Sequence, residues 1–573
     1  MNPATRLAGL AVRALAAAGV GHVVLCPGSR SAPLAYELAR AAAGADLQLH
    51  IRHDERVAAF TALGVGLSGT TIGAVATTSG TAVANLAPAV LEAHHANRPL
   101  VVVTADRPPA LRGTWANQTS ELQTGLFGDA VRARLDLDDA AAAADPLAAL
   151  EALVTTLIAA GGGRSSRPGP VHLNLGFTEP LLPDGDRDAA VDVELLPQPA
   201  SGGSDHPLDH PLGLPQGQRT VVLAGDGAGP AAREFAEAAG LPLLAEPSSL
   251  ARGGPNAVGP YRLLLDLPEL GGAVERVVTF GRPTLSRSVT RLLCRPDVEV
   301  VLVTPYPAWP EPGRPVTRCV RVAAEGVAEG VGPRSWLDDW CRAGAAAAGA
   351  IDVVLDDEAR AGRITGPLLA RELWAHLRPG EHLVAGSSNP IRDLDLAAPP
   401  IPGPGPAPHV VANRGLAGID GTVSAATGLA LAAGPTRVLL GDVTFLHDVG
   451  ALLVGPADRR PDLQVVVLND DGGGIFSLLE YGGLAEAGPV SAAEFDRLFG
   501  TPHGADLSAL CRGYGVRHEL VKDVPRLREA LADPGPGTGI VEVRADRAWL
   551  RGLHASLGAA ARAAAAEALD RHA

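Results

Sequence analysis

The chain has 573 residues, of which 46% are hydrophobic and 19% charged; this is typical of a globular protein and too long for one hydrophobic core. A formal net charge of −15 excludes non-specific binding to nucleic acid or to an anionic membrane surface, because both depend on a basic face. Five cysteines without a CxxC pair predict a reduced, cytoplasmic protein, and no apolar run reaches the ~18 to 20 residues of a membrane-spanning helix.

The first segment, "RLAGLAVRALAAAGV", predicts an amphipathic helix, because Arg13 interrupts the apolar run that a signal peptide would need. Short apolar runs that end in glycine or polar residues then recur and predict β-strands. They are "HVVLCPGS", "TIGAVATTSGT", "PLVVVTADRP", "RTVVLAGDGAG", "RVVTFGRP", "VEVVLVTP", "EHLVAGSSN", "TRVLLGDVT", "LQVVVLNDD" and "GIVEVRAD". Ala- and Leu-rich segments of helical length lie between them, so we expect an α/β protein with parallel sheets covered on both faces.

Two segments interrupt this alternation. Residues 181–218 are rich in Pro, Gly, Asp and His and are typical of a linker, and residues 332–366 are largely helical in pattern. We therefore expect three doubly wound parallel-sheet domains, at 1–185, 219–350 and 351–573, with a linker at 186–218.

Acidic residues follow two neighbouring predicted strands near the C-terminal end. Asp442 follows "TRVLLG", and Asp470 lies 28 residues further on, in "VVVLNDDGGGIF". Adjacent parallel strands would bring both carboxylates to one sheet edge, where they and a backbone carbonyl could hold Mg²⁺ together with phosphate oxygens. Glycines 472–474 would let the backbone approach such a ligand closely. The alternative is that both acids only cap helices.

This constellation resembles the GDG…NN signature of thiamin diphosphate enzymes. It departs from the signature at Val443, in place of the second glycine, and at Asp470, in place of the second asparagine. The resemblance implies the three-domain fold of that family, with pyrimidine-binding, middle and diphosphate-binding domains. It also implies that thiamin diphosphate binds with Mg²⁺, or Mn²⁺ in its place. The implied metal ligands are Asp442, Asp470 and the carbonyl of Gly472, with Gly441 and Gly473 beside the diphosphate.

A literal GDG occurs elsewhere, at Gly225, Asp226 and Gly227. One crossover later the chain reads "ARGGPNAVGP", which is no strand, so we expect this turn to be structural.

Glu55 follows the short strand "LQLHI" and begins a predicted helix. An acid in a helix's first turn is usually favoured by the helix dipole alone. The resemblance implies instead that Glu55 contacts N1′ of the cofactor's aminopyrimidine and activates the cofactor. It further implies cofactor contacts for Ser388, Ile419, Ile475 and Phe476; the last three would form an apolar floor, and their alternative interpretation is plain core.

Polar residues at other strand ends point to anionic substrates. They are Ser29, Arg30, Arg107, Asn117, Gln118, Arg392 and Arg414, with Arg287 in the middle segment. Singly, each arginine is typical of a solvated surface charge. In the motifs "PGSRSAPL", "TADRP", "NRGLAGIDG" and "GGGIFSLL", however, the chain resembles the MenD branch of the thiamin diphosphate enzymes, which acts in menaquinone biosynthesis. Arg287 stands where members of that branch can carry Lys.

The MenD resemblance implies decarboxylation of 2-oxoglutarate and 1,4-addition of the resulting succinyl unit to isochorismate. Both substrates are dianions, and guanidinium groups can hold carboxylates bidentately. In the family, the Glu55 position and the diphosphate site meet across a subunit interface, which implies a homodimer or a homotetramer.

Two other readings remain open at this point. An acetohydroxyacid-synthase-like enzyme would share the fold and metal motif but would bind FAD and small pyruvate-type acids, with less use for many arginines. A catalytically inactive binding protein would not need Glu55 and both metal acids intact. The tandem histidines His94 and His95, which resemble those of pyruvate-type decarboxylases, precede a strand instead of following it, so we expect them to be structural.

Overall fold

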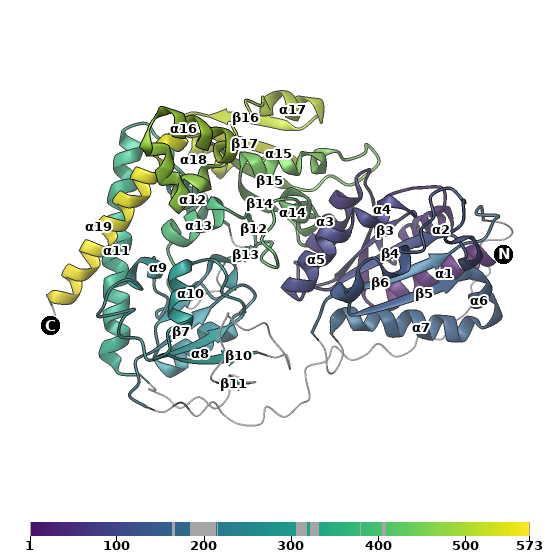
Figure 1. Cartoon of the computed structure of the whole chain (residues 1–573), viewed down its shortest axis with the longest axis horizontal. Helices are drawn as coiled ribbons and strands as arrows, with labels where there is room; N and C mark the ends of the chain where they lie inside the picture. Colours follow the sequence, from purple (N-terminus) through teal and green to yellow (C-terminus); the bar gives the residue numbers. More distant parts are fainter. Residues whose placement is uncertain are drawn as a thin grey trace. The chain divides into compact units, whose positions relative to one another are not determined.

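The computed structural model describes residues 2–162, 167–183, 214, 216–304, 318–320, 332–378, 380–403 and 408–571. These residues form three parallel β-sheets flanked by helices (Figure 1), which confirms the predicted α/β fold class. The predicted linker at 186–218 lies outside the described residues except for 214 and 216–218. Every helix among the described residues is too short or too polar to cross a bilayer.

The first sheet has the strand order β2-β1-β3-β4-β6-β5. Its strands are β1 (Val20–Leu25), β2 (Gln48–Ile51), β3 (Ile72–Thr77), β4 (Leu100–Asp106), β5 (Ala133–Asp138) and β6 (Pro170–Gly176). The helices around it are α1 (Pro3–Ala17), α2 (Ala32–Ala43), α3 (Glu55–Gly66), α4 (Thr81–Ala84), α5 (Ala87–Ala96), α6 (Asp139–Ala144) and α7 (Pro146–Ile158).

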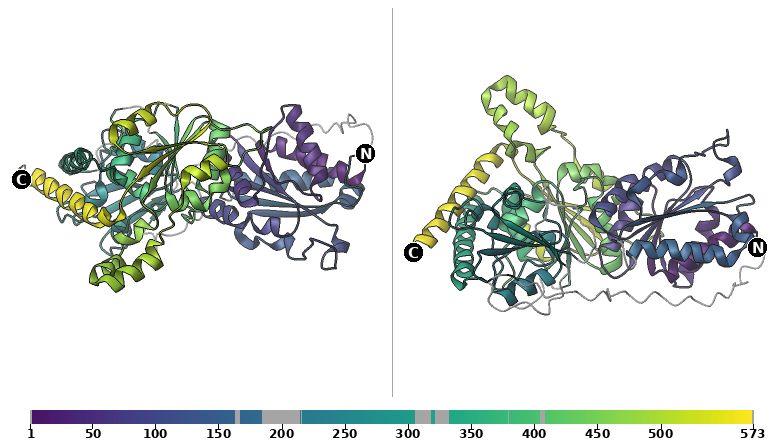
Figure 2. Two further views of the ribbon diagram at one scale, coloured as in Figure 1. Left: turned by 90° about the horizontal axis from the view of Figure 1, so that it is seen from above. Right: turned by 60° about the horizontal axis from the view of Figure 1, so that its bottom comes forward.

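Alternating strand residues of the first sheet enter two cores. Val23 and Val103 pack with residues of α1, α2 and α7 on one face, whereas Val24 and Val102 pack with residues of α3 and α5 on the other. Figure 2 shows helices on both faces of this sheet. Burial on both faces explains why its strands read as nearly continuous apolar runs.

The second sheet has the order β11-β10-β9-β7-β8. It contains β7 (Thr220–Ala224), β8 (Leu243–Ala245), β9 (Arg276–Phe280), β10 (Glu299–Val303) and β11 (Arg318–Val320), with α8 (Ala231–Ala239), α9 (Tyr261–Leu264) and α10 (Arg287–Leu293). The long helix α11 (Arg334–Arg360) follows, so the expected helical interruption is confirmed, and the predicted domain boundary at 350 falls inside this helix.

The third sheet, β13-β12-β14-β15-β17-β16, repeats the strand order of the first. Its strands are β12 (His382–Ala385), β13 (His409–Val411), β14 (Thr436–Gly441), β15 (Leu463–Asn469), β16 (Arg517–Val521) and β17 (Thr538–Arg544). The helices are α12 (Gly366–Ala375), α13 (Asn389–Ala397), α14 (Thr422–Ala433), α15 (Asp442–His447), α16 (Pro489–Phe495), α17 (Leu507–Gly513), α18 (Val524–Ala532) and α19 (Leu550–Asp570).

By their internal contacts the residues form two compact units. The first unit holds residues 1–205, 413–436 and 447–463, and the second holds 206–412, 437–446 and 464–573. Thus α14, which follows β13 in the chain, packs in the first unit against α3. The helices meet at glycines: a Cβ on Gly64 would lie 1.9 Å from the carbonyl oxygen of Ala425, and one on Gly428 1.9 Å from that of Thr61.

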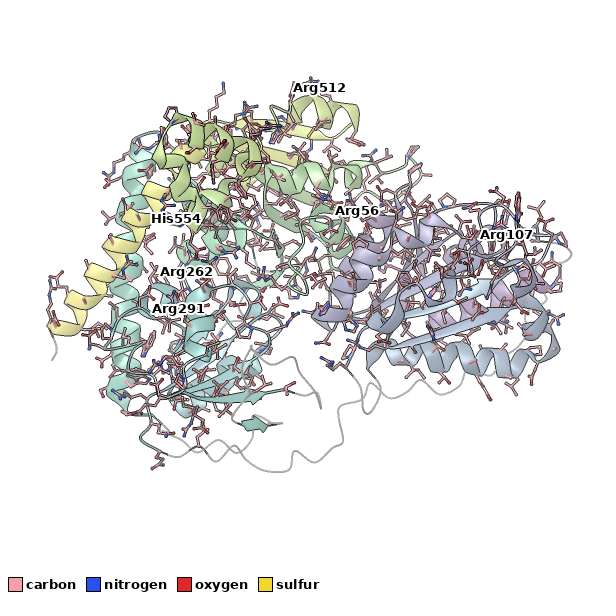
Figure 3. All side chains as sticks on the ribbon, in the orientation of Figure 1. Arg56, Arg107, Arg262, Arg291, Arg512 and His554 are labelled. Carbon is pink, nitrogen blue, oxygen red and sulfur yellow. The ribbon has the colours of Figure 1, made fainter. Side chains whose placement is uncertain are left out.

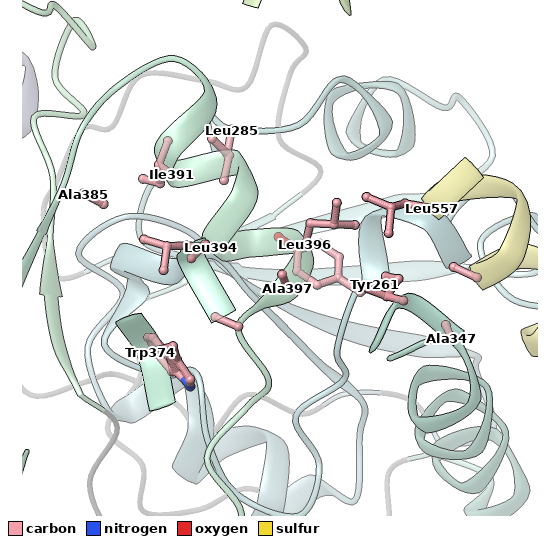
Figure 4. Packing of buried hydrophobic residues seen from close by; sticks show 14 of the residues in the cluster. Tyr261, Leu285, Ala347, Trp374, Ala385, Ile391, Leu394, Leu396, Ala397 and Leu557 are labelled. Carbon is pink, nitrogen blue, oxygen red and sulfur yellow. The ribbon is translucent and has the colours of Figure 1, made fainter. Parts of the chain in front are cut away.

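The core of the second unit joins residues that are far apart in the sequence. Figure 4 shows Tyr261, Ala347, Trp374, Leu394 and Leu557 in one buried cluster. Helix α19, yellow in Figure 1, runs beside α11. The second and third sheets therefore share one hydrophobic core.

Candidate active site

In the first and third sheets the strand order reverses at equivalent points, between β1 and β3 and between β12 and β14. Ligands of open parallel sheets bind beside the carboxyl ends of strands at such points. The predicted residues Ser29 and Arg30 follow β1, Ser388 follows β12, and Asp442 directly follows β14.

The two predicted metal-binding acids lie at neighbouring strand ends, since β14 and β15 are adjacent in the sheet. Asp442 is 1% exposed; its Oδ1 accepts the N–H of Val443 at 2.7 Å and its Oδ2 that of Gly472 at 2.9 Å. Burial, followed by the negative charge of Asp442, raises the pKa of Asp470 to about 7. The two carboxylates thus repel each other in a place that water reaches poorly.

The glycines after Asp470 are required by close approaches. A Cβ on Gly472, which has φ of +140°, would lie 1.9 Å from the carbonyl oxygen of Gly500. A Cβ on Gly474 would lie 2.0 Å from Oδ2 of Asp470. Any side chain at these positions would displace either the turn or the carboxylate.

One residue of this site, His503, was not predicted from the sequence. Its Nδ1 accepts the N–H of Ala505 at 2.9 Å, so the proton of the neutral ring lies on Nε2, which is 3.0 Å from Oδ2 of Asp442. The backbone N–H groups of His503 and Gly504 also bind Oδ1 of Asp471, at 3.1 and 2.8 Å. These bonds lower the pKa of Asp471 and stabilise it at φ of +57°, which is unusual for a residue other than glycine.

A second unpredicted residue, Arg547, secures the same turn. Its guanidinium donates to the carbonyl oxygens of Asp470 and Asp471 and, at 2.5 Å, to Oδ1 of Asp496. His503 and Arg547 lie 33 and 77 residues beyond Asp470 in the sequence, and no local motif marks either of them. Only the tertiary structure could identify them.

The residues at this edge fit a magnesium ion that is shared with a diphosphate. The donors that Mg²⁺ prefers are carboxylate and carbonyl oxygens, completed by water or phosphate. The described residues contain no group of three or more His, Cys, Asp or Glu side chains arranged for a metal ion. Two carboxylates and a carbonyl from the protein would leave positions for phosphate oxygens.

The other predicted residues of the second unit have different surroundings. Ser388 has φ of +74°, and its carbonyl accepts from the guanidinium of Arg392 at 2.6 Å. Phe476 lies in a half-buried aromatic cluster with Tyr481 and Phe499, and Ile475 precedes it in the same 3₁₀ turn. Arg287 is 70% exposed and pairs with Glu480 at 2.8 Å.

In the first unit, two predicted arginines lie close enough to interact. Arg30 donates to the carbonyl of Phe177 at 2.9 Å, and its Nε is buried without a hydrogen-bond partner among the described residues. Burial, followed by the positive charge of Arg107, lowers the pKa of Arg30. Nη2 of Arg30 also lies 3.6 Å from Oε1 of Glu179, whose negative charge offsets part of this repulsion.

Arg107, labelled in Figure 3, is linked to the predicted residue Gln118. It donates to the carbonyl of Gln118 at 2.5 Å and to the hydroxyl of Ser79 at 3.1 Å, while Gln118 Nε2 donates to the carbonyl of Ser79 at 2.8 Å. Ser79 follows β3, on the other side of the reversal point from Arg30. The neighbouring residue Asn117 and Ser29 are both exposed.

Three more predicted residues lie in the first unit. Glu55 is the first residue of α3, half-buried, after Asp54, which caps the helix by accepting the N–H groups of Arg56 and Val57. Arg414 and Ile419 lie in the segment before α14, where Arg414 is 4% exposed.

The two sequence features expected to be structural have structural partners. His94 lies in the last turn of α5, with its Nδ1 2.8 Å from the carbonyl of Ala130 and 2.8 Å from the guanidinium of Arg132. In the second GDG, a Cβ on Gly225 would lie 2.1 Å from the backbone nitrogen of Pro283, so this turn packs directly against another loop.

Comparison with known proteins defines the class. The family described as "Thiamine pyrophosphate enzyme, N-terminal TPP binding domain" matches residues 5–126. This match covers most of the first sheet, and together with the three parallel sheets it gives the chain the architecture of a thiamin diphosphate enzyme.

Relatives align over nearly the whole chain, and each is named 2-succinyl-5-enolpyruvyl-6-hydroxy-3-cyclohexene-1-carboxylate synthase. The protein of Arthrobacter sp. (strain FB24) is 50% identical over 585 residues, covering 99% of this chain and 93% of its own. That of Kineococcus radiotolerans is 49% identical over 579 residues, covering 99% and 100%. That of Paenarthrobacter aurescens is 50% identical over 575 residues, covering 98% and 97%. The chain belongs to the 2-succinyl-5-enolpyruvyl-6-hydroxy-3-cyclohexene-1-carboxylate synthase family.

Proposed function

We propose that this protein uses thiamin diphosphate and Mg²⁺ to decarboxylate 2-oxoglutarate and to add the remaining four-carbon unit to isochorismate. The 1,4-addition yields 2-succinyl-5-enolpyruvyl-6-hydroxy-3-cyclohexene-1-carboxylate, the compound after which the relatives are named. When bound, thiamin diphosphate supplies the electron sink that lets a 2-oxo acid lose CO₂ and its keto carbon act as a nucleophile.

The observation that carries this proposal is the pair of carboxylates, buried Asp442 and half-buried Asp470, at neighbouring strand ends beside a strand-order reversal point. Burial and the charge of Asp442 raise the pKa of Asp470; a divalent cation would stabilise its ionised form, and a diphosphate would supply the remaining oxygens. In this proposal the carbonyl of Gly472 is the third protein ligand, Gly441 and Gly473 lie beside the diphosphate, and Ser388, Ile419, Ile475 and Phe476 contact the cofactor.

The acid and the arginines have separate tasks. Glu55 shares a proton with N1′ of the cofactor's pyrimidine and thereby activates it. The guanidinium groups of Arg30, Arg107, Arg392 and Arg414 bind the carboxylates of the two dianionic substrates, assisted by Ser29, Asn117 and Gln118. The closeness of Arg30 and Arg107 supports this assignment, because paired cations favour an anionic ligand. Arg287 is assigned the same task, although its present partner is Glu480.

We also infer the organisation of the protein from the same family. Its three sheets would form a pyrimidine-binding domain (1–185), a middle domain (219–350) and a diphosphate-binding domain (351–573). The active form would be a homodimer or a homotetramer, located in the cytoplasm, as the lack of a CxxC pair in the sequence favours.

The direct test is an assay of purified protein with thiamin diphosphate, Mg²⁺, 2-oxoglutarate and isochorismate, followed by the loss of isochorismate and the release of CO₂. We expect both only when all four components are present, and we expect chelation of the metal to stop them. Equal consumption of isochorismate with pyruvate in place of 2-oxoglutarate would contradict the proposal and favour a pyruvate-type enzyme.

A further inference from the structure

A buried glutamate of α5, Glu92, holds the segment that carries Arg414. Glu92 is 4% exposed, and its two carboxylate oxygens accept the N–H groups of Gly415 and Leu416 at 2.6 and 2.7 Å. These are the two residues that follow Arg414, and all four belong to the first unit. A carboxylate that accepts hydrogen bonds from two consecutive backbone N–H groups fixes the direction of the chain at that point.

The contact is too close to tolerate any other residue at position 415. A Cβ there would lie 2.3 Å from the carbonyl oxygen of Glu92 and 2.9 Å from the backbone nitrogen of Ala96. The segment therefore lies directly on the surface of α5. Six residues further on, a Cβ on Gly421 would lie 2.1 Å from the ring of Phe60 in α3.

The far end of the segment is held by a second buried acid. Asp448 is 0% exposed, and its carboxylate accepts the N–H and the hydroxyl of Ser424 at 2.7 and 2.8 Å, in the first turn of α14. Residues 414–424 are thus fastened at both ends to buried carboxylates. Arg414 and Ile419 lie between or beside these two anchors.

We propose that Glu92 is a positioning residue that sets the place of Arg414, and through the same segment that of Ile419, for the reaction. This rests on the proposed function, in which Arg414 binds a substrate carboxylate and Ile419 contacts the cofactor. Glu92 lies in the middle of α5, where no backbone N–H of its own helix needs a cap. Both of its oxygens serve the other segment, which is the arrangement a positioning role requires.

The variant Glu92→Gln tests this with almost no change in size. The amide oxygen can still accept one N–H, but the NH₂ group is a donor and faces the second N–H, so one of the two bonds is lost. We expect the KM of a substrate to rise and kcat/KM to fall roughly ten- to a hundredfold, as small misplacements of binding groups do. We expect the affinity for thiamin diphosphate with Mg²⁺ to change much less. In the protein without cofactor, hydrogen exchange at the amides of Gly415 and Leu416 should accelerate.

Glu37→Gln is the matched control, because Glu37 is a glutamate of the same unit that is 6% exposed and paired with Arg40 inside α2. It should lower the melting temperature while leaving KM and the exchange of 415 and 416 unchanged. The positioning role is wrong if Glu92→Gln, like this control, leaves KM and the exchange of residues 415 and 416 unchanged. It is also wrong if the amides of 415 and 416 exchange faster in Glu92→Gln while KM and kcat/KM stay normal. If the unaltered protein fails to consume isochorismate with 2-oxoglutarate, the proposed function itself is wrong and this assignment falls with it.

Discussion

At the scale of single residues, the two acids of the candidate active site differ in their hydrogen-bond partners. Asp470 is half-buried beside another acid, whereas Asp442 has its orientation fixed by two backbone N–H groups and by His503. Partners of this kind orient a ligand before the metal arrives. If the proposed function is right, the bond from His503 Nε2 to Asp442 should therefore matter for binding of the cation.

We predict that His503→Ala weakens the binding of Mg²⁺ in the presence of thiamin diphosphate, roughly tenfold or more, as is usual for loss of such a partner. Titration calorimetry or a metal-dependent thermal shift would measure it. His376→Ala is the control, since the Nδ1 of His376 lies 2.7 Å from the carbonyl oxygen of Glu372 in the preceding helix, away from the two strand-end acids in the sequence. Equal metal dependence in the two variants would show that His503 does not act on the metal site.

Glu55 provides the second residue-scale prediction. Glu55→Gln keeps the size and the helix start, because the cap comes from Asp54, but it removes the carboxylate that shares a proton with the cofactor. We expect most of the turnover to be lost, by roughly a hundredfold or more, with the far-UV circular dichroism and melting temperature unchanged. Near-normal turnover of isochorismate would refute the role assigned to Glu55.

At the scale of elements, the contact between α3 and α14 depends on glycines. We predict that Gly428→Ala in α14 lowers the melting temperature by several degrees, because its Cβ would overlap the carbonyl of Thr61, and overpacking of this kind costs about 1–3 kcal/mol. Gly349→Ala in α11 is the matched control: no atom lies within 4 Å of its Cβ, so the better helix propensity of alanine should leave stability equal or higher. Differential scanning calorimetry of both variants makes the comparison, and equal melting temperatures would show that α14 does not pack closely on α3.

The elements also show what the sequence can and cannot predict. Strands that are apolar on both faces, such as β4 and β15, were predicted directly, together with the polar residues at their ends. Strand β6 was not, because it carries His172 and Asn174, which are buried but satisfied by bonds such as that from Thr104 to Asn174 at 2.8 Å. The edge strands β5 and β16 were missed because exposed faces leave no apolar run. Glu92, His503 and Arg547 act on residues far away in the sequence, so their roles depend on the fold.

At the scale of the whole molecule, both units contain buried carboxyl groups. The pKa values of these groups affect how the stability of the protein depends on pH. Burial raises the pKa of Asp448 in the first unit to about 7 and that of Asp393 in the second to about 8. The unfolded value is near 3.9. Between the unfolded pKa and the folded pKa, the folded protein keeps a proton that the unfolded chain releases. The free energy of unfolding therefore falls as the pH rises through the folded pKa.

Histidines oppose this trend only at lower pH. Burial lowers the pKa of His172 and of His554 to about 4, so these residues destabilise the fold only where the unfolded chain binds protons, below about pH 6.5. Above about pH 6.5 the contribution of these and the other histidines with lowered pKa values fades, so the raised carboxyl groups, Asp470 among them, outweigh it. We therefore predict that the melting temperature of the cofactor-free protein falls across this window, and that Asp448→Asn and Asp393→Asn each flatten the fall, because an amide stays neutral. Calorimetry at matched ionic strength measures it; a melting temperature that rises from pH 6.5 to 8 would mean that these carboxyl groups are already ionised in the folded protein.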